Sequence, residues 1–180
     1  MNRKLLSALI IAGTAIAAQT ASAADGTITF NGEVTANTCT INGNGSGASD
    51  FLVTLPSVST SALAADGVSA GRKDFKIELT NCTPDSGNVH TYFEPGITTD
   101  LQTGNLIVDA GGAQNVQIRL LNDDFSAIKA GFADAAQNSK PVAIAGGSAT
   151  LPYFAEYVAV GGPATAGVAN SSVVYSLSYQ

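Results

Sequence analysis

Cys39 and Cys82 are the two cysteines of the chain and its first candidates for covalent or metal chemistry. In a chain that leaves the cytoplasm, as the first residues indicate below, two cysteines favour a single disulfide. The bond would close a loop of about 43 residues and stabilise the fold by roughly 4 kcal/mol on a chain-entropy basis. The alternative is a metal site. Cys-x2-Cys spacing is absent and the chain has one histidine, His90, so the sequence favours the disulfide over a metal site.

The stretch Gly67-Val68-Ser69-Ala70-Gly71 matches the G-x-S-x-G pattern, and His90 follows it in serine-hydrolase order. A nucleophile elbow needs a strand before the serine and a helix after it. Here a turn precedes the serine, and a strand is expected to follow from residue 73. A secreted serine hydrolase therefore stays a weak alternative. We expect no enzyme activity and no cofactor, and we interpret His90 as a solvent-facing strand residue.

Residues 1–23 have the pattern of a signal peptide. Arg3 and Lys4 form a basic start, residues 5–18 are an almost unbroken apolar run, and Ala21-Ser22-Ala23 is a cleavage site of the A-x-A type. The apolar run is too short for a comfortable membrane span, although an N-terminal anchor is the alternative. We therefore expect export and a mature chain of single-domain size.

The charge balance excludes several partners. Without Arg3 and Lys4, 6 of the 8 basic residues remain against 14 acidic ones, a net charge of −8. Such a chain has no basic stripe for nucleic acid or anionic lipid. After Lys140 the one charged side chain is Glu156, which suits a surface that is buried or covered by another subunit.

Short apolar alternations separated by Gly and Pro predict an all-β sandwich. The expected strands are residues 73–81, 89–94, 105–109, 116–121, 149–160 and 172–180. Residues 57–65 could hold a helical turn, and residues 122–140 could be a loop or a short helix. No helical periodicity is sustained after residue 23.

Two further patterns lie at the ends of the expected mature chain. In residues 26–34, Ile28, Phe30 and Val34 share one strand face with Gly26 and Gly32. Glycine within a strand often marks the close approach of another backbone. In the last expected strand, one face carries Val173, Tyr175, Leu177 and Tyr179, and the strand extends to Gln180. An apolar strand at each end predicts head-to-tail association, which gives a filament if it does not close.

These pieces together resemble a type 1 fimbrial subunit of the chaperone–usher class. The resemblance rests on the signal peptide, Gly26 to Val34 followed by Cys39, Leu55-Pro56, the F-x-I-x-L-x-x-C run from Phe75 to Cys82, the stretch from Pro152 to Tyr157, and the terminal Y-S-L-S-Y-Q. It covers essentially the whole chain.

The resemblance implies an incomplete immunoglobulin-like sandwich, completed by a donor strand from a neighbouring subunit. The implied organisation is a signal peptide (1–23), an N-terminal extension that acts as donor strand (24–38) and a pilin domain (39–180). The implied donor residues are Gly26, Ile28, Phe30 and Gly32. The implied chaperone-binding strand carries Val173, Tyr175, Leu177, Tyr179 and Gln180.

The implied function is a structural subunit of a surface fimbria that supports adhesion and biofilm formation. Its implied partners are identical or related subunits, a periplasmic chaperone and an outer-membrane usher, with export through the periplasm. A minor or adaptor subunit is an alternative, and so is a soluble domain whose first strand pairs with its own sheet. A tip adhesin would need a second domain, for which the chain has no room.

Overall fold

The computed structural model describes residues 28–29, 31 and 36–180, and every structural statement below concerns these residues. Two compact units are distinguished, residues 1–34 and 35–180. The expected signal peptide lies outside the described residues, as do Gly26, Phe30 and Gly32. Ile28 is described; it has no regular secondary structure and is exposed.

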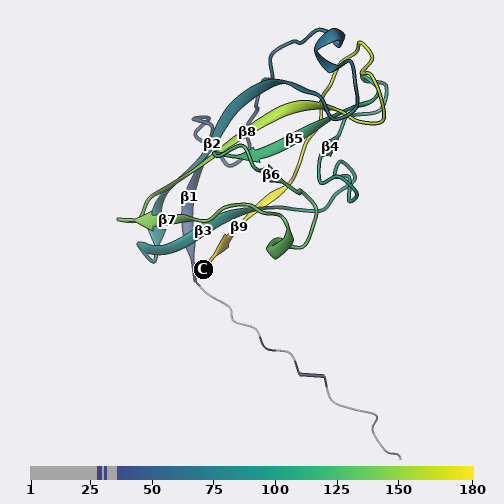
Figure 1. Cartoon of the computed structure of the whole chain (residues 1–180). Coiled ribbons are helices and arrows are strands. Elements are labelled where there is room, and N and C mark those ends of the chain that lie inside the picture. Colours follow the sequence, from purple (N-terminus) through teal and green to yellow (C-terminus); the bar gives the residue numbers. More distant parts are fainter. Residues whose placement is uncertain (1–27, 30, 32–35) are drawn as a thin grey trace, which may run out of the picture. The chain divides into compact units, whose positions relative to one another are not determined.

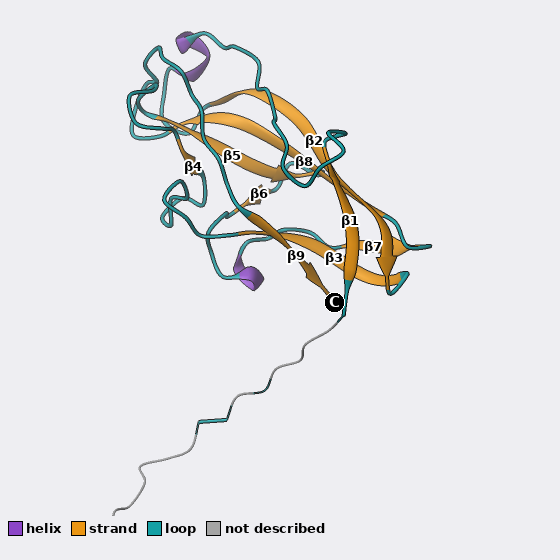
Figure 2. Cartoon of the chain, turned by 180° about the vertical axis from the view of Figure 1, so that it is seen from behind, coloured by secondary structure: helices purple, strands orange, loops and turns teal. Residues whose placement is uncertain are grey.

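The second unit is built from two antiparallel sheets (Figures 1 and 2). The larger sheet has the order β1-β2-β8-β5-β4, with β6 paired to β5. Its strands are β1 (Thr38–Gly43), β2 (Ser69–Thr83), β4 (Leu106–Ile107), β5 (Val116–Asn122), β6 (Ala127–Ile128) and β8 (Ala149–Ala159). The smaller sheet has the order β7-β3-β9, with strands β3 (Ser86–Phe93), β7 (Val142–Ala145) and β9 (Tyr175–Tyr179).

Period-two burial on these strands creates the core between the sheets. On β2, Phe75, Ile77 and Leu79 are buried, whereas the residues between them are more exposed. Side chains of β3, including Val89 and Phe93, face them from the smaller sheet and belong to the same apolar cluster. The alternation places one face of each sheet inward, as a sandwich requires.

Most predicted strands are confirmed, with changed bounds. β2 is longer than the predicted 73–81, β4 is shorter than 105–109, and β9 starts later than residue 172. The predicted helical turn within 57–65 is the 3-10 helix η1 (Thr60–Leu63). The uncertain stretch 122–140 contains β6 and a second 3-10 helix, η2 (Asp134–Ala136). Among the described residues, none belongs to a helix long and apolar enough to cross a membrane.

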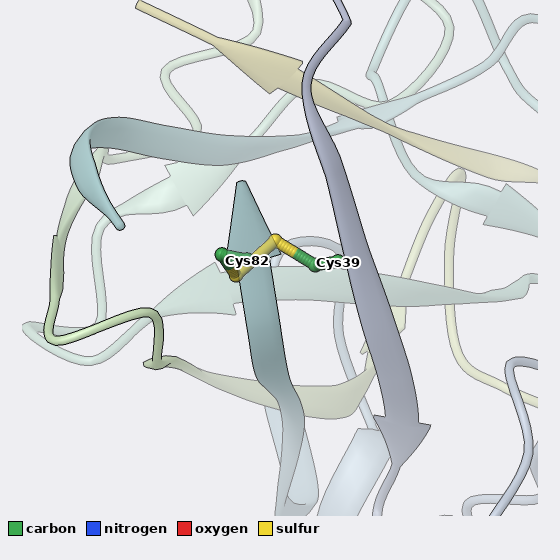
Figure 3. Close-up of a disulfide and its surroundings, with 2 residues drawn as sticks. All are labelled: Cys39 and Cys82. Atoms are coloured by element: carbon green, nitrogen blue, oxygen red, sulfur yellow. A yellow bond between two sulfur atoms is a disulfide. The ribbon is translucent and has the colours of Figure 1, made fainter. Parts of the chain in front are cut away.

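The predicted disulfide is confirmed. Cys39 near the start of β1 is bonded to Cys82 near the end of β2, with Cα atoms 4.1 Å apart (Figure 3). Thr38 pairs with Thr83 directly beside the bond, so the disulfide ties the two strands at the edge of the larger sheet. The connection it closes includes residues 44–68, which contain no strand.

Candidate functional site: a groove beside the last strand

A groove of about 540 Å³ opens between the two sheets on the side of β9. Its floor consists of core side chains from both sheets: Phe75, Ile77, Phe93, Leu106, Ile118, Leu120 and Ala155. One wall is the segment 171–177, which ends in β9, and the other is the segment 49–55. We call these the β9 wall and the 49–55 wall.

The β9 wall has a free backbone edge. β9 pairs with β3 on one side and is the last strand of its sheet among the described residues. Asn88 and Gln180 exchange both backbone hydrogen bonds, at 2.9 and 2.8 Å, and the Glu94 N–H donates to the Val174 carbonyl at 2.8 Å. Because bonded pairs alternate in an antiparallel ladder, the N–H and C=O groups of Tyr175, Leu177 and Tyr179 point away from β3.

Side chains of the β9 wall alternate in the same register. Val173, Tyr175 and Leu177 line the groove and are half-buried, whereas Val174, which also borders the groove, is 68% exposed. Tyr179 packs against the same core cluster without lining the groove. Strand pairing extends to the last residue of the chain through Gln180, as the sequence predicted.

The 49–55 wall has the burial pattern of a strand but no strand partner within the structure that is described. Phe51, Val53 and Leu55 are half-buried and line the groove, and Leu52 between them is 81% exposed. The Phe51-x-Val53-x-Leu55 alternation is the signal in the sequence from which this wall could have been predicted.

Phe51 and Tyr175 connect the 49–55 wall to the floor and to the opposite wall, and Val53 and Leu55 also pack on the core cluster. The Phe51 ring packs against Phe75 on the floor and against Tyr175 on the opposite wall, each with ring centroids 6.1 Å apart. The Tyr175 hydroxyl donates a hydrogen bond of 2.7 Å to the Ser49 carbonyl across the groove. The walls are therefore tied by side chains, while the backbone groups that face the groove have no backbone partner among the residues that the structure describes.

The residues of the hydrolase alternative are not brought together. Ser69 is the first residue of β2 in the larger sheet, and His90 lies on β3 in the smaller one. The prediction that His90 faces solvent was wrong: its side chain is buried, with Nε2 2.7 Å from the Asp134 carboxylate. The physical reason is that η2 brings the Asp134 carboxylate to the His90 ring, and Asp134 also accepts a 3.0 Å hydrogen bond from the Ser178 hydroxyl.

Glu156, the isolated charge of the C-terminal part, is buried on β8 between two arginines. Arg72 Nε donates to it at 2.8 Å and Arg119 Nε at 3.0 Å. Burial by itself raises the pKa of Glu156, but the hydrogen bonds and charges of Arg119 and Arg72 outweigh it and leave the pKa below its usual value. This cluster pairs neighbouring strands β2, β8 and β5 and lies apart from the residues that line the groove.

The fold and the groove define a class: an all-β sandwich with an apolar cleft between two backbone edges that have no partner among the described residues. A family profile described as "Type-1 fimbrial protein, A" matches residues 55–180. The chain is 50% identical over 165 residues to the major fimbrial subunit SMF-1 of Stenotrophomonas maltophilia, covering 88% of this chain and 95% of that protein. It is 46% identical over 162 residues to the F17 fimbrial protein of Escherichia coli, covering 87% and 88% of the two chains.

Solved structures agree on the fold. The P pilus rod subunit PapA has a TM-score of 0.60 at 21% identity, covering 79% of this chain and 99% of that one. A subunit from the structure of a chaperone–usher pilus has a TM-score of 0.58 at 22% identity, covering 87% and 96%. The chain belongs to the type 1 fimbrial protein family. It has the immunoglobulin-like fold of pilus subunits, and it is a structural subunit of a fimbria and not an enzyme.

Proposed function

We propose that this subunit polymerises by donating residues 26–34 as a strand to the groove of the next subunit. The observation that carries the proposal is the pair of unpaired edges that face each other across one apolar groove. A strand placed there would bond to the free edge of β9 on one side and to the 49–55 wall on the other. Strand addition to an exposed edge takes its affinity from backbone bonds and its specificity from alternate side chains.

The proposed donor is long enough to span the groove, and its pattern matches the groove lining. At about 3.3 Å per residue, nine donor residues extend over roughly 30 Å, and the seven residues 171–177 of the β9 wall extend over roughly 23 Å. Ile28, Phe30 and Val34 would cover the apolar floor, and Gly32 would lie where little side-chain space remains. Thr29 and Asn31 would point to solvent, because successive strand residues face opposite sides.

The polymer follows from the geometry of this contact. Each subunit carries one donor segment and one groove, so a contact between different surfaces repeats head to tail and does not close. The relatives named above include a protein described as a major fimbrial subunit, and we propose the same role for this chain.

Export and assembly would need two further partners, a periplasmic chaperone and an outer-membrane usher. We propose that residues 1–23 direct the chain to the periplasm, where a chaperone covers the β9 edge and binds the carboxylate of Gln180. An outer-membrane usher would then receive the subunit while the donor segment replaces the chaperone. The apolar lining of the groove supports the proposal of a chaperone, because an apolar groove beside a free strand edge promotes aggregation unless it is covered.

A deletion tests the proposal. A chain without residues 26–34 should form no fibres, and it should bind one synthetic peptide of residues 24–38 per subunit in native mass spectrometry. A peptide with Ile28→Asp and Phe30→Asp is the matched control and should not bind. Fibres formed by the deleted chain would contradict the proposal.

A further inference from the structure

We infer that Tyr175 is a spacer that holds the groove at the width of one strand before the donor enters, and so accelerates insertion. The inference rests on the proposed function, because it assigns to one groove residue a part in strand insertion. Tyr175 belongs to β9, and its hydroxyl reaches the backbone carbonyl of Ser49 in the opposite wall at 2.7 Å.

The need for a spacer follows from how the 49–55 wall is held. Its residues make no backbone–backbone hydrogen bond within the described structure. Phe51 attaches the wall to the floor through Phe75, and Val53 and Leu55 also pack on the core cluster, but these contacts involve no residue of β9. Tyr175 is the side chain whose hydrogen bond joins the two walls. Its ring also packs edge-on against Phe51, which keeps the hydroxyl directed at Ser49.

The reach of the Tyr175 contact is comparable with the space that a single added strand needs. Neighbouring strands lie about 4.8 Å apart, so the walls on either side of an inserted strand lie roughly 9–10 Å apart. A phenol side chain and one hydrogen bond, extending from the backbone of one wall to the backbone of the other, prevent both collapse and wide opening. Without this spacer, the distance between the 49–55 wall and the β9 wall would vary widely. The donor strand could then enter only in the fraction of conformations that have the required distance.

The hydroxyl remains a donor under ordinary conditions. Burial, together with the nearby Asp50 carboxylate, raises the pKa of Tyr175, so the phenol stays protonated at neutral pH. Because the acceptor is a backbone carbonyl, no substitution at Ser49 removes it, and the contact is tested on the tyrosine side.

The test compares Tyr175→Phe with Tyr179→Phe. Both tyrosines lie on the same face of β9 and are half-buried, but no hydrogen bond of the Tyr179 hydroxyl is present in the described structure. The full chain would carry Phe30→Asp so that its own segment does not compete, and association of a fluorescent peptide of residues 24–38 would be followed by anisotropy.

We expect Tyr175→Phe to lower the association rate constant about threefold, within the range of one neutral hydrogen bond, with an unchanged dissociation rate constant. Tyr179→Phe should leave both constants unchanged. Tyr175→Leu, which also removes the ring contact with Phe51, should lower the association rate constant further.

Three outcomes would overturn the inference. The first is a Tyr175→Phe association rate constant equal to that of the parent, and the second is an equal fall for both tyrosine variants. The third is a change confined to the dissociation rate constant, which would indicate an ordinary contact with the bound peptide. Failure of the parent chain to bind the peptide at all would instead refute the proposed function, and the inference with it.

Discussion

Phe51 occupies the space that a side chain at residue 43 would need. A Cβ atom added to Gly43 would lie 1.9 Å from Cδ1 of the Phe51 ring, far inside any real contact. Gly43 is the last residue of β1, and Phe51 is the first of the three half-buried residues of the 49–55 wall. The absence of a side chain at the end of β1 therefore determines where the groove wall can lie.

Replacement of this glycine should displace the wall. We expect Gly43→Ala to destabilise the subunit by about 1–3 kcal/mol through overpacking and to weaken binding of the donor peptide. Gly96→Ala is the control, because a Cβ there meets no atom within 4 Å. Urea unfolding and peptide titration of both variants check the prediction. A Gly43→Ala chain that matches the parent in both measurements would show that the wall accommodates the added methyl group.

Loss of the disulfide should remove most of the folded subunit. Cys39→Ser or Cys82→Ser releases the connection between β1 and β2, at a cost of about 2–5 kcal/mol in small secreted domains. We expect little periplasmic subunit for either variant, measured by immunoblot. Two titratable thiols in the unreduced parent protein would contradict the assignment.

Glu156 should make the free energy of unfolding depend on pH in the acid range. Its pKa is lowered in the folded state, so its contribution is present above the unfolded-state value near pH 4.5 and is lost as the pH falls through the folded value. We expect Glu156→Gln to be less stable than the parent by about 1–3 kcal/mol at pH 7, since the two arginines lose a charged acceptor and one of its two oxygens. Unfolding by urea at pH 7 and pH 3 measures this, and the difference should shrink at pH 3. A constant difference across that range would mean that the carboxylate charge is not the cause.

Tyr179 should tolerate loss of its hydroxyl but not of its ring. Its side chain packs half-buried on the core cluster, and its backbone groups lie on the free edge of β9. Tyr179→Phe should therefore be milder than Tyr179→Ala or Tyr179→Asp in periplasmic level and fibre yield. Normal accumulation and fibre entry of Tyr179→Asp would show that this end of β9 is not the surface that partners cover.

The alternation of apolar and polar residues along a strand explains which parts of the fold could be predicted from the sequence. β2, β5 and β8 are long strands with one buried face, so their patterns are clear. The environment of His90 was mispredicted because η2, 44 residues later, covers it, and no local pattern carries such a contact. The 49–55 wall was not predicted, although it alternates, because it belongs to no sheet in the described structure. Its importance becomes visible only when the free edge of β9 is placed opposite to it.

The comparison of Phe30→Ala with Asn31→Ala tests donation of residues 26–34 most directly. Phe30 would be buried in the neighbour's groove, where Phe→Ala costs about 3–5 kcal/mol, and Asn31 would face solvent one residue later. Periplasmic subunit level and fibre yield are measured for both variants. We expect normal subunit levels for both, with few or fragile fibres for Phe30→Ala and nearly normal fibres for Asn31→Ala. Normal fibre yield for Phe30→Ala, or its degradation as an unassembled subunit, would contradict donation of this segment.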